Sequence, residues 1–279
     1  MICAVCGQSA KLWRVVDGYA YTDCTACGSI AIDASSMRQV DEGRFPRNYD
    51  PTYWAKEDRA ARARSWGSSL ARVAETVLYC RRPIRRFLDI GSGPGHLLDA
   101  LSAYLPTRAE SHFLAVEKFP PDTHTSHPGY LVGEVCDLDA PVDAGICVEV
   151  VEHLTPTQFD NIVRQLASRS SPGSLFLFNT GLPDYVKNED PNYIDPLGRG
   201  HIVSWGWPAL TDIFGRHGFT VFPVAGKSFA FVAEHQSSDP TPMRDRIWSP
   251  PAENRELLRD PQMGEVLYML GLESARAYG

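Results

Sequence analysis

The feature that most constrains the fold is a glycine-rich segment between an apolar strand and a helix. Arg86–Ile90 has the length and character of a buried strand, and residues 91–95 read Gly-Ser-Gly-Pro-Gly. Leucines at 97, 98, 101 and 105 then share one face of a helix. Glycine adopts left-handed backbone and allows close approaches that a Cβ would block. The segment therefore predicts a ligand-binding turn at the carboxyl end of a parallel strand.

The rest of the chain alternates apolar segments of strand length with helical patterns. Apolar residues recur at helical spacing from Glu57 to Cys80 and from Phe159 to Leu166. The other strands that we expect are 112–116, 129–135, 145–150, 174–179 (after a Pro172-Gly173 turn), 219–222 and 229–234. Apolar strands that alternate with helices are typical of a sheet covered on both faces, so the pattern predicts an α/β fold.

The spacing of the glycines indicates the ligand. A dinucleotide-binding loop would read Gly-x-Gly-x-x-Gly, whereas Gly91, Gly93 and Gly95 occupy every second position. The carboxylate of Asp89 would repel a pyrophosphate and attract an amino group or a sulfonium. S-adenosylmethionine carries both cations, so it is the ligand that we expect. The alternative is a generic Rossmann turn that binds a nucleotide or no ligand.

From about residue 45 to residue 235, the sequence resembles the class I S-adenosylmethionine-dependent methyltransferases. The resemblance implies a Rossmann-like, doubly wound, seven-stranded and mostly parallel sheet. It also implies that Glu117 binds the ribose hydroxyls and that Cys136 and Asp137 lie beside the adenine. A further similarity is the ending Glu149-x-x-Glu152-His153-Leu after the fourth strand. The cofactor-binding residues that we expect are Asp89, Gly91, Gly93, Gly95, Glu117, Cys136, Asp137 and Glu149.

Four of the seven cysteines form two pairs, Cys3-x-x-Cys6 and Cys24-x-x-Cys27. The 17 residues between the pairs suit a tetrahedral four-thiolate zinc site. Asp17-Gly18, between two β-like segments, predicts a hairpin. We therefore expect a zinc ribbon in which structural Zn²⁺, held by Cys3, Cys6, Cys24 and Cys27, supplies folding energy. The alternative is a redox Cys-x-x-Cys, although no thioredoxin-like βαβ pattern flanks either pair.

The cysteine content also bears on the compartment. The seven cysteines are odd in number and unevenly spaced, which favours a reducing compartment over a disulfide framework. We expect Cys80, Cys136 and Cys147, which lie in or beside apolar segments, to be ordinary buried thiols. The first residues lack the basic and apolar regions of a signal peptide. No apolar run approaches the roughly 20 residues that span a membrane. We therefore expect a cytoplasmic protein.

We expect four parts along the chain. They are a zinc ribbon at 1–40, a connector and helix at 41–85, the cofactor-binding core at 86–235, and a linker with a C-terminal helix at 236–279. Residues 44–51 and 236–252 read as connecting segments. Leucines and valines in the helix expected at 253–272 offer a surface for docking or for a homodimer.

Two histidines are candidate catalytic residues, because methyl transfer to a hydroxyl benefits from a general base. His153 follows the fourth strand, and His201 lies in the loop after the fifth, where ligands of such sheets gather. The alternatives are helix capping or packing for His153 and the ordering of a lid beside Trp205 for His201. Together with Glu149 and Glu152, the histidines could instead bind Mg²⁺, Mn²⁺ or Fe²⁺, an arrangement that resembles the small-RNA 3′-terminal 2′-O-methyltransferases.

The charge balance bears on the acceptor. The chain has 27 Lys and Arg against 34 Asp and Glu, a net charge of −7 that disfavours nucleic acid. Residues 56–86 nevertheless carry an excess of +6, which suits a solvated helix face or phosphate contacts. The leading hypothesis is methylation of a small-molecule or carbohydrate hydroxyl in a biosynthetic pathway, with a nucleotide-sugar or natural product as acceptor. The alternatives are an RNA methyltransferase, of the zinc-finger ribosomal base type or the metal-assisted 2′-O type, and a catalytically silent S-adenosylmethionine-binding zinc scaffold.

Overall fold

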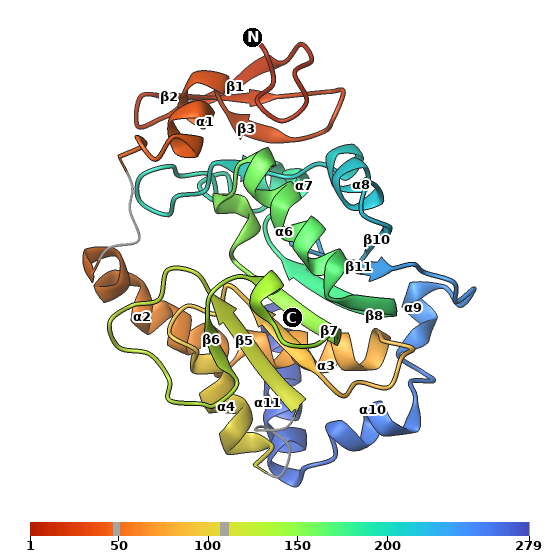
Figure 1. Ribbon diagram of the computed structural model, residues 1–279. Helices are drawn as coiled ribbons and strands as arrows, with labels where there is room; N and C mark the ends of the chain where they lie inside the picture. The colour runs from red at the N-terminus through yellow and green to blue at the C-terminus, as the bar shows by residue number, and fades with distance from the viewer. Residues whose placement is uncertain (47–50, 107–111, 279) are drawn as a thin grey trace. The chain divides into compact units, whose positions relative to one another are not determined.

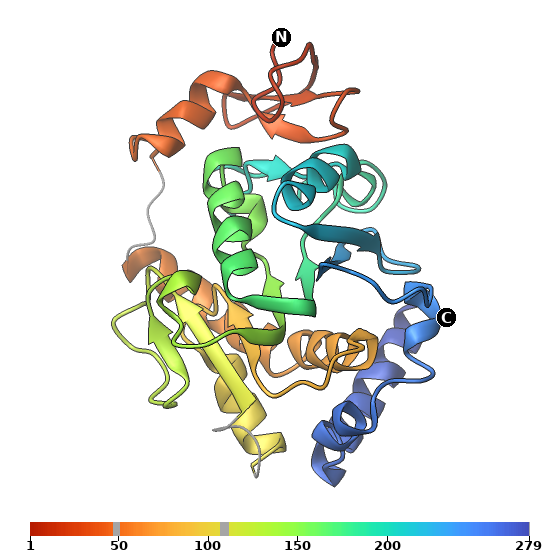
Figure 2. The ribbon, with the colours of Figure 1, turned by 45° about the vertical axis from the view of Figure 1, so that its right-hand side comes forward.

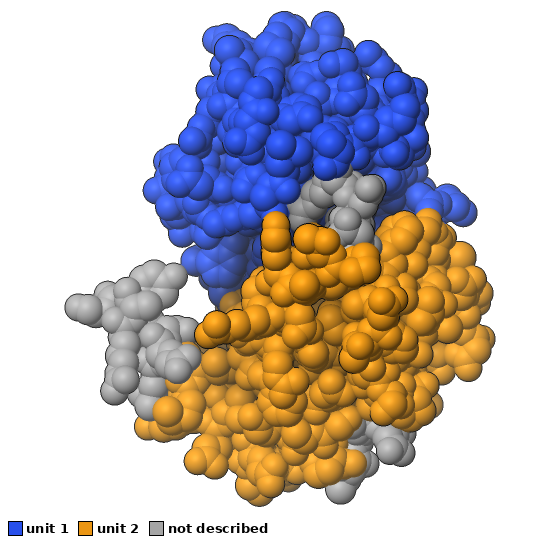
Figure 3. All heavy atoms as spheres, turned by 90° about the vertical axis from the view of Figure 1, so that its left-hand side faces the viewer, with its two compact units in different colours: residues 1–48, 149–167, 178–233 blue, residues 49–148, 168–177, 234–279 orange. Residues whose placement is uncertain are grey.

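The computed structural model describes residues 1–46, 51–106 and 112–278, with side chains through residue 271. Residues 47–50 of the predicted connector therefore lie outside the described residues. The chain divides into two compact units, coloured separately in Figure 3. Unit 1 comprises Met1–Asn48, Glu149–Ala167 and Phe178–Ala233, and unit 2 comprises Tyr49–Val148, Ser168–Leu177 and Glu234–Gly279. The four-part division along the sequence stays a prediction.

The N-terminal segment of unit 1 folds into a small sheet, which we call the ribbon sheet. It contains β1 (Lys11–Val16), β2 (Tyr19–Asp23), β3 (Ile30–Ile32) and β9 (Val203–Ser204), in that order, and α1 (Ala34–Asp41) follows β3 in the chain. β1 and β2 form the predicted hairpin, because Asp17 and Gly18 adopt the left-handed φ angles, 51° and 84°, that a tight two-residue turn requires. The antiparallel addition of β9 to β3 was not predicted.

A seven-stranded sheet has the order β10-β11-β8-β7-β4-β5-β6 (Figure 1). Its strands are β4 (Phe87–Ile90), β5 (Phe113–Glu117), β6 (Tyr130–Val132), β7 (Val142–Val148), β8 (Ser170–Asn179), β10 (Phe219–Pro223) and β11 (Ala230–His235). β4 runs parallel to β5 and β7, and β5 runs parallel to β6. All four residues of β4 are buried, as expected for a strand covered on both faces. The predicted Rossmann-like, mostly parallel sheet is confirmed.

Two strand boundaries differ from the prediction. β7 ends at Val148 rather than at residue 150, because Glu149 turns the backbone with a φ of 56°. β8 begins at Ser170 and includes Pro172-Gly173, which we predicted as a turn before the strand. Gly173 has a φ of 80°, so it accommodates an irregularity within the strand, and the Ser174 hydroxyl donates to Val142 O at 2.8 Å.

In unit 2, the predicted helical region 57–80 consists of two helices, α2 (Pro51–Ser65) and α3 (Ser68–Tyr79). The break falls at Gly67, whose φ and ψ of −130° and −103° are not helical. Leu70, Val73 and Val77 of α3 are fully buried, whereas α2 has no buried residue. The basic residues of α2 therefore belong to an exposed helix, as expected for a solvated face. The glycine loop leads into α4 (His96–Tyr104).

The remaining elements are short or follow the predicted helices closely. They are the 3₁₀ turns η1 (Val135–Asp137) and η2 (Val151–His153) and the helices α6 (Pro156–Ser168), α7 (Pro183–Asn188) and α8 (Trp207–Gly215). No helix within the described residues is long and apolar enough to cross a membrane.

The C-terminal segment of unit 2 packs on α3 through α9 (Met243–Arg246), α10 (Ala252–Leu257) and α11 (Pro261–Tyr278), as Figure 2 shows. The helix predicted at 253–272 is therefore two helices, and the side chain of Leu272 lies outside the described residues. The cause is Pro261, because proline has no N–H to continue a helix and is favoured at a new N-terminus.

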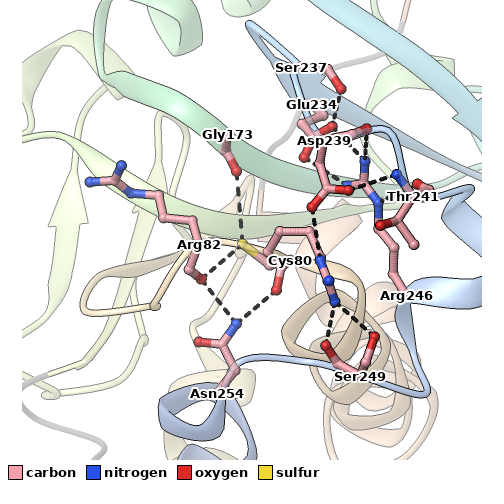
Figure 4. A network of polar contacts seen from close by, with 11 residues as sticks. Cys80, Arg82, Gly173, Glu234, Ser237, Asp239, Thr241, Arg246, Ser249 and Asn254 are labelled. Carbon is pink, nitrogen blue, oxygen red and sulfur yellow. Dashed lines mark hydrogen bonds and ion pairs between the residues drawn. The ribbon is translucent and has the colours of Figure 1, made fainter.

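Polar contacts fasten this C-terminal segment (Figure 4). Asn254 donates to Cys80 O at 2.9 Å and to Arg82 O at 3.0 Å, so it satisfies carbonyls just beyond α3. Arg246 and Glu234 form a fully buried ion pair at 2.8 Å.

Cys80 and Cys147 are buried as predicted, but Cys136 is exposed because it lies on η1 after the edge strand β6.

Candidate functional site

The glycine loop of unit 2 has the conformation that its sequence predicts. Gly91, Gly93 and Gly95 have φ angles of 70°, 55° and 79°, which L side chains rarely adopt. A Cβ on Gly95 would lie 2.3 Å from Thr125 Cγ2, and one on Gly93 would lie 3.2 Å from the Trp54 ring. The nearest neighbours of these two glycines within the protein are therefore side chains, and the close approach of the loop to a ligand stays a prediction.

Two acidic residues flank this loop, Asp89 within β4 and Glu117 at the end of β5. Asp89 is buried, and its burial together with the charge of Glu117 raises the pKa of Asp89 to about 7. The Glu117 carboxylate accepts hydrogen bonds from Gly93 N at 2.9 Å and Phe119 N at 2.8 Å. Each carboxylate oxygen has a further lone pair, so Glu117 can still accept from a ribose hydroxyl. Two neighbouring buried carboxylates favour a cationic ligand, and this environment fits S-adenosylmethionine.

A cavity of about 460 Å³ opens beside the loop. It is lined by Pro51, Trp54, Ala55, Asp58, Pro94, Pro120, Pro121, Asp122 and Thr123. Phe119, which precedes this prolyl segment, is 54% exposed although it is a large aromatic residue. We did not predict a role for Phe119, and its position two residues after Glu117 is the signal that could have indicated one.

Cys136 and Asp137 are exposed residues on η1 in the same unit. Asp137 Oδ2 accepts from Glu134 N at 2.8 Å, so one of its oxygens caps the 3₁₀ turn. The other oxygen can accept from an amino group such as that of adenine. The predicted roles of both residues stay predictions.

The four N-terminal cysteines come together in unit 1. Cys3 Sγ lies 3.7 Å from Cys27 Sγ, and Cys6 Sγ lies 3.6 Å from Cys24 Sγ. All four sulfurs lie within 4.8 Å of one another. Zn–S bonds of about 2.3 Å in a tetrahedron place neighbouring sulfurs about 3.8 Å apart, so the cluster fits a four-thiolate zinc site.

Glu152, His153 and His201 form a second cluster in unit 1, which we call the histidine cluster. One donor atom from each lies within 4.8 Å of the others, and the two imidazole centroids are 4.9 Å apart. Glu152 and His201 are buried, whereas His153 is half-buried. His153 ends η2, and His201 lies two residues before β9, so separate loops of the chain bring them together.

The backbone selects the tautomers of both histidines. His153 Nδ1 lies 3.0 Å from Gly200 O, and His201 Nδ1 lies 2.7 Å from Tyr193 O. A carbonyl only accepts, so each Nδ1 carries the proton and each neutral ring has its lone pair on Nε2. A neutral imidazole in this tautomer can accept a proton or bind a metal through Nε2.

Acidic and phenolic groups surround these rings. Glu152 Oε1 accepts from the Tyr193 hydroxyl at 2.9 Å and lies 3.8 Å from His201 Nε2. Burial, and then the charge of Glu149, raise the pKa of Glu152 well above its usual range. Asn179 Nδ2 donates to Glu149 Oε1 at 3.0 Å, and the charge of Glu149 acts on Glu152, so Glu149 lies near the histidine cluster. No sequence motif indicated the role of Tyr193, because its contact with Glu152 spans 41 positions.

The match to a protein family agrees with the fold. The family described as "Methyltransferase domain" matches residues 55–224, more than half of the chain. No curated protein matches the sequence significantly. Among solved structures, the chain is similar to CalS10, an amino pentose methyltransferase from Micromonospora echinaspora involved in calicheamicin biosynthesis, with 17% identity, a TM-score of 0.45 and coverage of 68% of this chain and 98% of that one. It is also similar to DesVI from Streptomyces venezuelae, with 13% identity, a TM-score of 0.46 and coverage of 68% and 100%. The family match shows that the chain belongs to the methyltransferase-domain family and is an S-adenosylmethionine-dependent methyltransferase.

Proposed function

We propose that this enzyme methylates a hydroxyl group of a small-molecule or carbohydrate acceptor, with His153 and His201 providing the general base. The observation that carries the proposal is that His153 and His201 each have Nδ1 within hydrogen-bond distance of a backbone carbonyl. Both Nδ1 protons are donated to backbone carbonyls, so both Nε2 atoms are basic. A general base needs such a lone pair within reach of the acceptor proton.

The proposed step moves one proton and one methyl group. S-adenosylmethionine supplies the methyl group as an electrophile and leaves as S-adenosylhomocysteine. The acceptor oxygen forms the new O–C bond, and its proton moves to Nε2 of a histidine in the cluster. The positive imidazolium formed in this way is stabilised by the negative charge of Glu149. Glu152, whose Oε1 lies 3.8 Å from His201 Nε2, has a pKa raised by burial and by that same charge.

For the cofactor, we propose that Asp89 attracts the cationic methionine end and that Glu117 accepts from the ribose. Gly91, Gly93 and Gly95 shape the loop, and Cys136 and Asp137 lie toward the adenine. Phe119 is 54% exposed and follows Glu117 by two residues, and we propose that its side chain lies beside the bound cofactor. Glu149 lies with the histidine cluster, and a contact with the cofactor stays a prediction. Cys3, Cys6, Cys24 and Cys27 would hold a structural Zn²⁺.

The test of the function uses methyl-labelled S-adenosylmethionine with fractionated cell extract. We expect label in the small-molecule fraction, and label confined to RNA would contradict the proposal. Once an acceptor is found, His153→Ala and His201→Ala should each lower kcat by about 10²- to 10⁴-fold. Cofactor affinity, measured by calorimetry, should stay within about twofold. Parent-like kcat in both variants would remove the histidine cluster from the reaction.

A second candidate is metal-assisted methyl transfer, in which the histidine cluster binds a divalent transition metal. Glu152 Oε2 favours it, because this fully buried oxygen has no hydrogen-bond donor within the described residues. Backbone carbonyls on both Nδ1 atoms are also the usual outer partners of metal-binding histidines. Two imidazoles and a carboxylate suit Mn²⁺ or Fe²⁺ better than Mg²⁺. The metal would lower the pKa of an acceptor hydroxyl.

Electron paramagnetic resonance decides between the two candidates. The zinc-loaded protein is titrated with Mn²⁺, which prefers nitrogen and oxygen ligands to thiolates. If methyl transfer is metal-assisted, we expect one Mn²⁺ to bind per chain and the Glu152→Gln variant to bind it at least about tenfold more weakly. Glu253→Gln, at an exposed position of α10, is the matched control. The absence of Mn²⁺ binding to the parent protein would leave the metal-free base mechanism.

A further inference from the structure

The backbone that follows His201 is part of the ribbon sheet. β9, which begins two residues after His201, pairs antiparallel with β3 through Ile30↔Ser204 and Ala31↔Val203. The pairing starts immediately beyond the histidine, because Ile32 N donates to Ile202 O at 2.9 Å. His201 is therefore joined to the cysteine-rich segment by backbone hydrogen bonds, although most of the chain separates them in sequence.

Tyr21 holds the histidine itself. Its hydroxyl, on the fully buried side chain of a β2 residue, donates to His201 O at 2.8 Å. Ile202 N donates to Glu152 O at 2.8 Å, and His201 N donates to Asp195 O at 2.9 Å. The backbone on both sides of the imidazole is therefore fixed, and Tyr21 is the member of this set that comes from the ribbon sheet.

The second cysteine pair fixes the other end of β9. A Cβ on Gly206 would lie 2.3 Å from Gly28 C and 2.5 Å from Cys27 O, so only glycine allows this contact between the two backbones. Gly206 N also donates to Ser29 Oγ at 2.9 Å. The turn that contains Cys24 and Cys27 thus packs directly against the residue before α8, and β9 is held between Tyr21 and this turn.

We propose that the cysteine ribbon is a positioning device for His201, in which Tyr21 and the Cys24–Cys27 turn set where the imidazole lies in the histidine cluster. The inference rests on the proposed function of His201 as part of the general base. His201 Nδ1 contacts Tyr193 O at 2.7 Å, and a small shift of its backbone would change both that contact and the 3.8 Å approach to Glu152. Loss of zinc, or of the Tyr21 hydroxyl, would therefore lower methyl transfer without changing the cofactor loop, since a misplacement of about 1 Å can lower a rate about 10²-fold.

The decisive variant is Tyr21→Phe, because it removes one hydroxyl and leaves the ring and the four cysteines in place. We expect kcat to fall by about 10- to 100-fold, with the affinity for S-adenosylmethionine and the zinc content unchanged. The matched control is Tyr19→Phe, which alters a half-buried tyrosine of the same strand whose ring packs on Phe45. We expect the control to keep the kcat of the parent enzyme.

Nuclear magnetic resonance of ¹⁵N-labelled histidine gives a readout that does not require turnover. The His201 signals, assigned by their loss in His201→Ala, should change in position in Tyr21→Phe. They should stay unchanged in Tyr19→Phe. Chelation of zinc from the parent protein should cause a change in the same signals. Unchanged His201 signals and unchanged kcat in Tyr21→Phe would overturn the inference.

The failure of the proposed function has a different signature. If His201→Ala retains full turnover, His201 does not take part in the reaction, and the role proposed for His201 as part of the general base fails whatever Tyr21→Phe does. If His201→Ala is inactive while Tyr21→Phe matches the parent in both kcat and His201 signals, the function stands and only the positioning role is lost.

Discussion

At the scale of single residues, Asp89 shows how burial couples cofactor binding to pH. The carboxyl lies in the glycine-loop strand, and burial together with the nearby Glu117 charge raises its pKa to about 7. A cationic ligand needs Asp89 in its ionised form. The same raised pKa means that the ligand-free fold loses stability as pH rises from about 4 to about 7, because over this range the unfolded chain releases the proton that the buried carboxyl keeps.

We therefore predict that the affinity for S-adenosylmethionine falls about tenfold from about pH 8 to about pH 6, as Asp89 takes up a proton. Calorimetry across this range measures the effect. Asp89→Asn should bind more weakly at every pH and show a flat profile. Asp212→Asn, which removes an exposed carboxylate of α8, is the control and should keep the slope of the parent. A parent affinity independent of pH would contradict the role of Asp89.

The histidines illustrate how far single residues could be predicted from the sequence. The Glu149-x-x-Glu152-His153 motif and the loop position of His201 were sufficient to place them among the candidates. Their tautomers were not predictable, because the carbonyls that select them belong to Tyr193 and Gly200, outside the motif. The fold brings Glu152, His153 and His201 together, so this part of the candidate site is a product of loop geometry.

At the scale of elements, the glycine loop and α4 depend on two separate properties of glycine. Gly95 needs a left-handed φ of 79°, and it also needs the absence of a Cβ beside Thr125 and Tyr130. The first requirement was evident from the strand–loop–helix pattern. The second was not, because the crowding side chains, Thr125 and Tyr130 at the start of β6, lie some 30 to 35 positions further along the chain.

We predict that Gly95→Ala destabilises the protein by several kcal/mol and abolishes cofactor binding. The substituted Cβ would meet Thr125 Cγ2 at 2.3 Å, in addition to the strain of about 1–2 kcal/mol from the left-handed backbone. Gly226→Ala isolates the strain alone, because Gly226 has a φ of 73° and no atom within 4 Å of the added Cβ. Thermal and denaturant unfolding measure both effects. Equal losses in the two variants would show that crowding at Gly95 does not matter.

Local sequence preferences, such as those of proline and glycine, predicted some boundaries of helices and strands and failed to predict others. Pro261 separates α10 from α11, as proline at a helix start would predict, yet the leucine pattern across it suggested one helix. Pro172-Gly173 suggested a turn, but β8 passes through it, because pairing within the sheet outweighs a local preference for turns.

At the scale of the whole molecule, the cysteine pairs and the ribbon sheet show how local and distant contacts combine. The spacing of the cysteines sufficed to predict a four-thiolate cluster, and their sulfurs meet within 4.8 Å. The sequence suggested a separate module. In unit 1, however, the ribbon sheet takes β9 as its fourth strand and binds His201 through Tyr21.

We predict about one zinc per chain in the purified protein, and its loss in Cys24→Ser, because a three-thiolate site binds zinc far more weakly. Metal analysis by mass spectrometry measures the content. The variant should also unfold at a lower temperature, since a small ribbon depends on its metal. Cys136→Ser, at an exposed thiol outside the cluster, should retain the zinc. A parent protein without zinc would refute the metal site.

The sequence by itself determined the α/β class, the glycine loop and the cysteine cluster, because each is encoded in short segments whose spacing imposes a local geometry. The tertiary structure decided which distant groups meet: β3 with β9, Tyr21 with His201, and Tyr193 with Glu152. Such contacts depend on the summed packing of many elements, and no single segment carries their energy. The histidine cluster is therefore assembled by the tertiary structure, whereas the cofactor loop can be recognised from the sequence alone.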